Sequence, residues 1–276
     1  LGHEMGGVIA SGERSGERVV IEPANPCGQC DVCRAGHGNL CQQVQFCGHA
    51  PTPGGLSTLM AWPGRLLLPI PDTIEGDDVA LLEPLGIALH AIDLGHFEPG
   101  MSAGVYGCGP IGLFLIRALR AAGAGLIQAS DPLPHRLEAA LSSGADEVRP
   151  TDVDGQPDGV DSWGPVDVTF DAAGEDAAVE TALRTVRTGG RVVVVGIPPD
   201  DRTSFGAALA REKGLTVVLS RRMKAHHMRQ AIDLVDRGAV DLGDMITSRY
   251  PISQGTEAFA ELVNRSGLKI VIKPAG

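Results

Sequence analysis

The stretch that decides the fold class is Tyr106-Gly107-Cys108-Gly109-Pro110-Ile111-Gly112, a G-x-G-x-x-G pattern. It follows an apolar strand expected at 103–106 and opens a helix expected at 111–122, and this context makes the pattern specific. Glycines let backbone N–H groups approach a pyrophosphate at a helix N-terminus. A doubly wound fold that binds another nucleotide is the alternative. Four residues of the loop are expected to bind a dinucleotide: Gly107, Gly109, Ile111 and Gly112.

An acidic residue follows the next expected strand, 126–129, about twenty residues after Gly112, as dinucleotide sites require. This residue, Asp131, predicts NAD rather than NADP, because a carboxylate accepts hydrogen bonds from ribose hydroxyls and repels a 2′-phosphate. Arg136 is expected over the adenine, or as a cation that partly relaxes this preference.

Short apolar runs alternate with helical patterns from 87 to 222, which predicts an α/β domain with a Rossmann-type, doubly wound parallel sheet. The run 192–195, four consecutive valines, is typical of a central strand buried on both faces. Ligands bind beyond the carboxyl ends of such strands, so Val195, Gly196 and Ile197 are expected near the nicotinamide. Residues 187–191 are expected to turn into the strand at 192–195. Simple chain reversal is the alternative for this turn and for the turn at 170–174, and for 170–174 it is the favoured interpretation.

The remaining sequence predicts a second domain. Residues 1–86 are rich in glycine, proline and short β-like runs, typical of a mostly β domain. Residues 223–276 contain two helical patterns and a last strand at 269–272, and are expected to return to that domain.

Four cysteines have the spacing of metal ligands: Cys27, Cys30, Cys33 and Cys41. Thiolates two residues apart can converge on one tetrahedral zinc at about 2.3 Å. Four thiolates leave no open position, so this zinc would be structural. A disulfide framework is the weaker interpretation, because these cysteines are confined to one lobe of a long acidic chain.

Three further residues form a second set of potential zinc ligands, apart from the four cysteines. His3 and Glu4 are adjacent, and Glu83 lies in an apolar segment where a carboxylate needs a metal, a cation or a hydrogen-bond donor. The alternatives are surface residues for the His-Glu pair, and a carboxylate in the first turn of a helix at 84–94 for Glu83.

Composition excludes several classes of protein. The 276 residues are 43% hydrophobic and 21% charged, as in globular proteins. The net charge of −11 argues against nucleic-acid binding. The most apolar stretch, 103–118, is broken by glycines and a proline, so no membrane span is expected. Free thiols without a signal peptide predict a cytoplasmic location.

Taken together, these motifs resemble the zinc-dependent medium-chain dehydrogenase/reductase family, in particular its sorbitol (polyol) dehydrogenase-like branch. The similarity covers essentially the whole chain in order, from the His-Glu motif at 2–8 through the cysteine lobe and 83–86 to the dinucleotide loop and 187–196. The resemblance implies a GroES-like catalytic domain, one structural and one catalytic zinc, and hydride transfer from a secondary alcohol or polyol to NAD. It also implies a homodimer or homotetramer, and Arg222 near the coenzyme or substrate.

In this family, a cysteine ligand and a proton-relay residue precede the His-Glu motif. The chain begins after that point, so we expect an N-terminally truncated form in which His3, Glu4 and Glu83 hold zinc poorly and turnover is negligible. The sequence does not specify the alcohol.

Three other functions remain open. A zinc-independent NADP-linked reductase of the same superfamily would need neither the His3-Glu4 pair nor the cysteine lobe. A non-enzymatic zinc module would explain only residues 27–41. A protein that binds NAD without turnover is the third, and it is distinguished from the enzyme by coenzyme assays.

Overall fold

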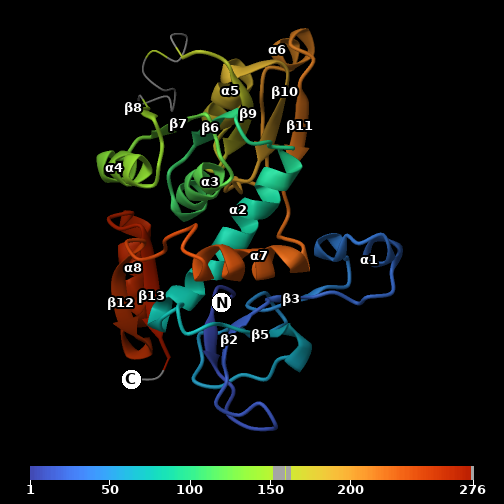
Figure 1. The fold of residues 1–276 in the computed structure, drawn as a ribbon, viewed down its shortest axis with the longest axis vertical. Coiled ribbons are helices and arrows are strands. Elements are labelled where there is room, and N and C mark those ends of the chain that lie inside the picture. The colour runs from blue at the N-terminus through green and yellow to red at the C-terminus, as the bar shows by residue number, and fades with distance from the viewer. Residues whose placement is uncertain (152–158, 160–162, 275–276) are drawn as a thin grey trace. The chain divides into compact units, whose positions relative to one another are not determined.

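The computed structural model describes residues 1–151, 159 and 163–274, and the chain forms two compact units (Figure 1). One unit consists of Leu1–Gly86 together with Arg222–Gly276, and the other of Ile87–Arg221. The first unit is therefore made from both ends of the chain.

A six-stranded parallel sheet organises the unit formed by Ile87–Arg221, with the order β11-β10-β9-β6-β7-β8. The chain builds outward from β6 to β8, then returns to β9 and builds outward the other way to β11. The order therefore reverses between β6 and β9, which confirms the predicted doubly wound α/β fold. The strands are β6 (Ser102–Tyr106), β7 (Leu126–Asp131), β8 (Glu147–Pro150), β9 (Val166–Asp171), β10 (Val186–Val194) and β11 (Thr216–Leu219).

The helices of this unit pack on the sheet through apolar faces. The helix that follows the glycine loop, α3 (Pro110–Ala121), starts with a proline, whose fixed φ suits a first helical position. It packs on β6 and β7, while α5 (Asp176–Thr185) packs on β6, β9 and β10. Val192 and Val193 of β10 are fully buried, as a central strand requires. The other helices are α2 (Leu82–Leu94), which enters from the first unit, α4 (Pro134–Ser142) and α6 (Ala207–Glu212).

Short sheets make up the other unit. Strands β1 (Gly6–Val8), β2 (Arg18–Ile21) and β5 (Leu67–Pro69) form an antiparallel sheet, and Met5, Ile21 and Cys47 form a buried cluster beside it. Two further pairs are antiparallel β3 (Ala24–Asn25) with β4 (Gln45–Phe46), and parallel β12 (Ile246–Pro251) with β13 (Lys269–Lys273). The helices are α1 (Asp31–Arg34), α7 (Ala225–Asp236) and α8 (Gly255–Asn264), with 3₁₀ turns at Gly38–Leu40, Gly64–Leu66, Gly76–Leu81 and Ile252–Gln254.

Some elements differ from the sequence prediction. The turn expected at 187–191 lies inside β10, where the register against β9 shifts between Val186 and Arg191. Strands β8 and β12 were not predicted, because each mixes charged and apolar residues without a clear period of two. Among the described residues, no helix is both long and apolar enough to cross a membrane.

Candidate active site and metal sites

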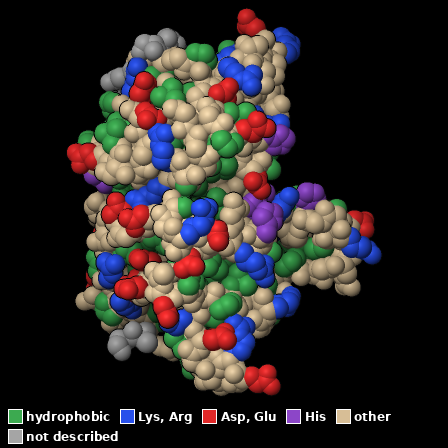
Figure 2. Space-filling view, in the orientation of Figure 1, with side chains coloured by type: hydrophobic (Ala, Val, Ile, Leu, Met, Phe, Trp, Pro, Cys, Tyr) green, Lys and Arg blue, Asp and Glu red, His purple; other side chains and the backbone are tan. Residues whose placement is uncertain are grey.

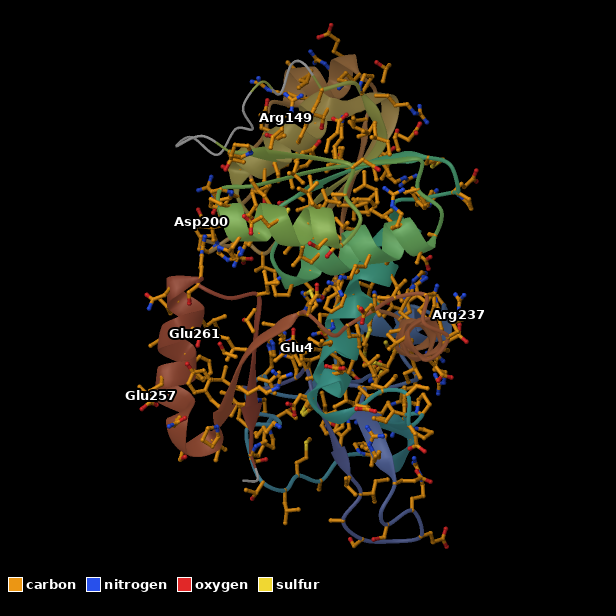
Figure 3. The ribbon with its side chains drawn as sticks, turned by 60° about the vertical axis from the view of Figure 1, so that its left-hand side comes forward. Glu4, Arg149, Asp200, Arg237, Glu257 and Glu261 are labelled. Carbon is orange, nitrogen blue, oxygen red and sulfur yellow. The ribbon has the colours of Figure 1, made fainter. Side chains whose placement is uncertain are left out.

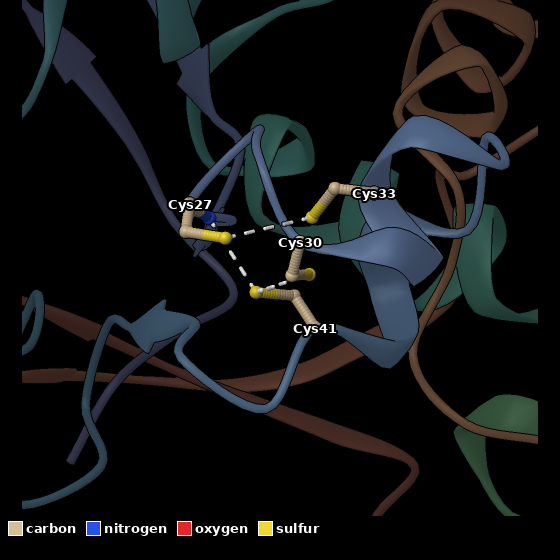
Figure 4. A group of neighbouring side chains, drawn as sticks. All are labelled: Cys27, Cys30, Cys33 and Cys41. Carbon is tan, nitrogen blue, oxygen red and sulfur yellow. Dashed lines mark hydrogen bonds between the residues drawn. The ribbon is translucent and has the colours of Figure 1, made fainter.

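The four predicted cysteines gather in one lobe and point toward one another (Figure 4). Their sulfur atoms all lie within 4.8 Å of one another, and the pairs Cys27–Cys33 and Cys30–Cys41 are 4.0 and 3.9 Å apart. Sulfur atoms of a tetrahedral zinc site with bonds of about 2.3 Å are separated by roughly 3.8 Å. All four thiols are free, so the observed arrangement fits one zinc ion and not a disulfide.

The backbone of the lobe prepares it for thiolates. Backbone N–H groups of Gln29 and Cys30 donate to the Cys27 sulfur and lower the pKa of this thiol to about 6. The Cys27 N–H also donates to the Cys41 sulfur, at 3.4 Å. Deprotonated sulfur is the form that binds zinc.

A second group of ligand atoms comes from three places in the first unit. His3 and Glu4 precede β1, and Glu83 lies in the first turn of α2. One ligand atom of each lies within 4.8 Å of the other two. The segment that carries His3 and Glu4 is fixed on both sides, since the Gly55 N–H donates to Gly2 O and the Ile21 N–H donates to Met5 O. An imidazole and two carboxylates are suitable zinc donors, so these residues fit a metal.

The electrostatics of this group reflect its burial. Glu83 is 3% exposed, and burial together with the neighbouring Glu4 carboxylate raises its pKa well above the usual value. Burial lowers the pKa of His3, against the opposing effect of Glu4. A neutral imidazole is the form that coordinates metal.

Two charged residues near this group were missed from the sequence. Lys269, the first residue of β13, contacts Glu4 through its ammonium group, and its charge also acts on His3 and Glu83. Glu4 is labelled in Figure 3. Glu22, directly after β2, is 4% exposed, and burial raises its pKa to about 7. Pairing across such long sequence separations leaves no local signal in the sequence.

An aromatic cluster adjoins His3. The Phe46 ring lies 5.3 Å from the His3 ring and 5.0 Å from that of His49, between ring centroids. The guanidinium of Arg222 lies 4.9 Å above Phe46, and its Nη1 donates to Asn39 O at 3.1 Å. Arg222 also has a φ of 53°, which is strained for a residue other than glycine. The structure thus places Arg222 on Phe46, which also contacts His3, and against Asn39 of the cysteine lobe. The predicted contact of Arg222 with coenzyme or substrate stays a prediction.

In the second unit, two glycines of the dinucleotide loop, Gly107 and Gly112, have no space for a side chain. Gly107 has a φ of 98°, and a Cβ atom there would lie 2.7 Å from the Ala173 nitrogen. A Cβ atom on Gly112 would lie 1.8 Å from Gly107 O. The backbone can therefore turn tightly from β6 into α3, which leaves N–H groups at the start of this helix to face a phosphate. Gly109 is the N-cap and Ile111 lies in the first turn.

Asp131 and Arg136 both lie at this loop. The carboxylate of Asp131, at the end of β7, accepts hydrogen bonds from the N–H groups of Cys108 (2.8 Å) and Leu133 (2.9 Å). Arg136 Nη1 is 3.7 Å from the same carboxylate. Asp131 is only 3% exposed, so the residue predicted to bind ribose also holds the glycine loop in place. Burial raises the pKa of the Cys108 thiol, and this cysteine is an inert, buried side chain.

Val195, Gly196 and Ile197 follow β10 at the same edge of the sheet. The N–H groups of Val195 and Gly196 donate to Asp171 O, at 2.9 and 3.0 Å. Ile197 is 86% exposed, which leaves an apolar side chain available for a ligand. The structure therefore brings these predicted residues to the carboxyl ends of β6, β9 and β10.

The surface adds one negative observation. On the face shown in Figure 2, acidic and basic side chains are interspersed and form no continuous basic area. This distribution and the net charge of −11 give no support to nucleic-acid binding.

Comparisons with known proteins agree with this geometry. The family model described as "Zinc-binding dehydrogenase" matches residues 110–237, and "Alcohol dehydrogenase GroES-like domain" matches residues 1–72. Sorbitol dehydrogenase of Bacillus subtilis is 31% identical over 285 aligned residues, which cover 99% of this chain and 80% of that protein.

Two solved structures with bound coenzymes are also similar. One, described as a short chain alcohol dehydrogenase from E. coli CFT073 with NADH, has a TM-score of 0.90 and 25% identity, covering 99% of this chain and 83% of that one. The other, a putative zinc-binding dehydrogenase from Sinorhizobium meliloti 1021 with NADP, has a TM-score of 0.89 and 28% identity, with the same coverage.

The chain is an oxidoreductase with a GroES-like domain and a dinucleotide-binding Rossmann domain. It belongs to the zinc-dependent medium-chain dehydrogenases, and within them to the polyol dehydrogenase-like branch. The resemblance inferred from the sequence motifs is thereby confirmed.

We predict that Cys33→Ala lowers the zinc content by about one equivalent and opens residues 27–41 to proteolysis, because metal binding contributes to the folding of such lobes. Zinc analysis and limited proteolysis measure both effects. Cys47→Ala, which removes a buried thiol outside the lobe, should keep the metal. Unchanged zinc content in Cys33→Ala would contradict a four-cysteine site.

Glu22 predicts a pH dependence of stability. Its pKa of about 7 in the folded chain exceeds the ordinary value of 4.5, so the folded state binds this proton more tightly than the unfolded state does. The free energy of unfolding should therefore fall by roughly 3 kcal/mol as pH rises from 4.5 through 7. Glu22→Gln should remove this fall, while Glu13→Gln, at an exposed site, should retain it. Denaturant unfolding at pH 5 and pH 8, at constant zinc content, measures how much the free energy of unfolding falls between these pH values. An equal fall in wild type and Glu22→Gln would contradict the prediction.

Proposed function

We propose that this chain oxidises a secondary alcohol or polyol with NAD⁺, using zinc held by His3, Glu4 and Glu83. The observation that carries the proposal is the convergence of these three ligands, from separate parts of the sequence, within 4.8 Å. The similarity to sorbitol dehydrogenase supports a polyol as the substrate class.

Each residue of this group has a definite task in the proposal. When bound, zinc supplies the Lewis acidity that lowers the pKa of an alcohol. Lys269 holds the Glu4 carboxylate and offsets part of the negative charge that Glu4 and Glu83 bring together. Phe46 packs against the His3 ring and orients it.

The coenzyme belongs to the second unit. NAD⁺ supplies the hydride acceptor. The loop Gly107–Gly112 would bind its pyrophosphate and Asp131 its adenosine ribose, with Arg136 beside the adenine. NAD is favoured by the buried Asp131 carboxylate, although relatives with either coenzyme are known. An NADP-dependent reaction is the second candidate, because Arg136 offsets part of this negative charge.

We also propose that the cysteine lobe binds zinc. The protein is further proposed to form a dimer or tetramer and to be cytoplasmic. The four lobe thiols support the location, because they must stay reduced to bind zinc. Analytical ultracentrifugation measures the oligomeric state.

The test combines turnover with metal content. The chain, loaded with zinc, is assayed with NAD⁺ and NADP⁺ against sorbitol, xylitol and butane-2,3-diol. With three protein ligands the site should hold zinc weakly and turnover should be low, and Glu83→Gln should lower both zinc affinity and kcat/KM by about a further 10–100-fold. Glu257→Gln, on α8 (Figure 3), should change neither. A Glu83→Gln variant with unaltered zinc affinity and turnover would show that the metal is held elsewhere.

Asp131 tests the coenzyme preference. We predict that Asp131→Ala weakens NAD binding by about 1–3 kcal/mol, because the ribose and the Cys108 N–H both lose a charged acceptor. The variant should also bind NADP better than the native chain does, relative to NAD. Calorimetric titration with both coenzymes measures this, with the exposed Asp200→Ala variant as control. Tighter binding of NADPH than NADH by the native chain would overturn the assignment.

A further inference from the structure

Asp171 joins two loops that the coenzyme site depends on. It is the last residue of β9 and is fully buried. Its Oδ1 accepts hydrogen bonds from the N–H groups of Ala173 (3.0 Å) and Gly174 (3.1 Å), while its main-chain oxygen accepts those of Val195 and Gly196. One residue therefore fixes both the turn after β9 and the turn after β10.

The same two turns touch each other and the glycine loop. A Cβ atom on Gly196 would lie 2.1 Å from the Gly174 nitrogen, and one on Gly174 would lie 2.7 Å from Ile197 O. Gly107 is in equally close contact with Ala173. Three backbone segments thus meet without intervening side chains at the carboxyl edge of the sheet, where dinucleotides bind.

Burying the Asp171 carboxylate costs folding free energy, because its second oxygen has no hydrogen-bond partner in the part of the chain that the structure describes. Oδ2 makes no hydrogen bond within geometric limits to any described residue, and a Cβ atom on Gly196 would lie only 2.8 Å from it. Burial raises the pKa of Asp171, while the N–H groups of Gly174, Ala173 and Gly196 oppose the rise. A carboxylate that serves packing alone would be replaced by an apolar side chain at lower cost.

We propose that Asp171 is a positioning residue for the nicotinamide half of the coenzyme. It holds the turns 172–174 and 195–197 in the single arrangement that leaves Val195 to Ile197 facing the ligand. The turn after β9 is then more than a chain reversal. This inference rests on the proposed function, since it assumes that the site binds a nicotinamide dinucleotide.

Asp171→Asn tests the inference sharply. The amide oxygen can still accept from Ala173 and Gly174, but the amide nitrogen places a donor against the N–H of Gly196. The turn 195–197 should shift, because two N–H donors then face each other where Oδ2 stood, and NADH binding should weaken about tenfold or more. AMP, which reaches only the adenosine side at Asp131, should bind within about twofold of wild type. The fluorescence shift of bound NADH should also decrease.

Asp167→Asn is the matched control. Asp167 lies on the same strand and accepts the Ser102 N–H at 2.8 Å, but at the opposite end of β9. A merely structural role would make both variants alike in coenzyme binding, whereas a positioning role predicts loss of NADH affinity only in Asp171→Asn. Gly196→Ala displaces the same turn from the other side and should reproduce the split between NADH and AMP.

The outcomes separate the two proposals. A wild-type chain that binds neither NADH nor NADPH would overturn the proposed function. Wild-type binding of NADH with unchanged affinity in folded Asp171→Asn would overturn the positioning role alone. Equal losses for AMP and NADH, or loss of the fold in both Asp171→Asn and Gly196→Ala by circular dichroism, would also overturn it, because both residues would then be structural.

Discussion

The contact of Gly107 with the turn after β9 is the constraint on which the second unit depends. Neighbouring parallel strands bring their carboxyl ends together, and here the backbones meet so closely that a single methyl group would separate them. Asp131 fixes one side of the loop through the Cys108 N–H, and Asp171 fixes the turn on the other side. The carboxyl edge of the sheet is therefore held by two buried carboxylates, while apolar packing supports the sheet behind it.

In the first unit, the main constraint is the negative charge of several carboxylates that lie close together. Glu4 and Glu83 approach each other closely enough to raise the pKa of Glu83, and Glu22 adds to the effect. Lys269 is a cation that the folded chain supplies to this group, and a metal ion would supply more positive charge. The same arrangement that suits the carboxylates to a metal thus concentrates negative charge, and this concentration favours the binding of a cation.

The local motifs could be predicted because the residues that form each of them are only a few positions apart in the sequence. The cysteine lobe, the glycine loop with Asp131, and the alternation of strands and helices all follow from residues close in sequence. Lys269 and Arg222 were harder, since the partners of each lie in distant segments, and Asp171 was interpreted as part of a plain turn. The register shift inside β10 was missed because a glycine pair flanked by polar residues predicts a turn as readily as a bulge.

The composition of the first unit from both ends of the chain has a consequence for biosynthesis. The second unit is contiguous in sequence, so all of its strands leave the ribosome before Lys269 does. The carboxylates near the amino terminus must wait for that residue, which closes a loop of nearly the whole polypeptide. Domains generally fold as units during synthesis. The second unit can therefore mature first, and the first unit acquires the contact of Lys269 with Glu4 as one of its last folding events.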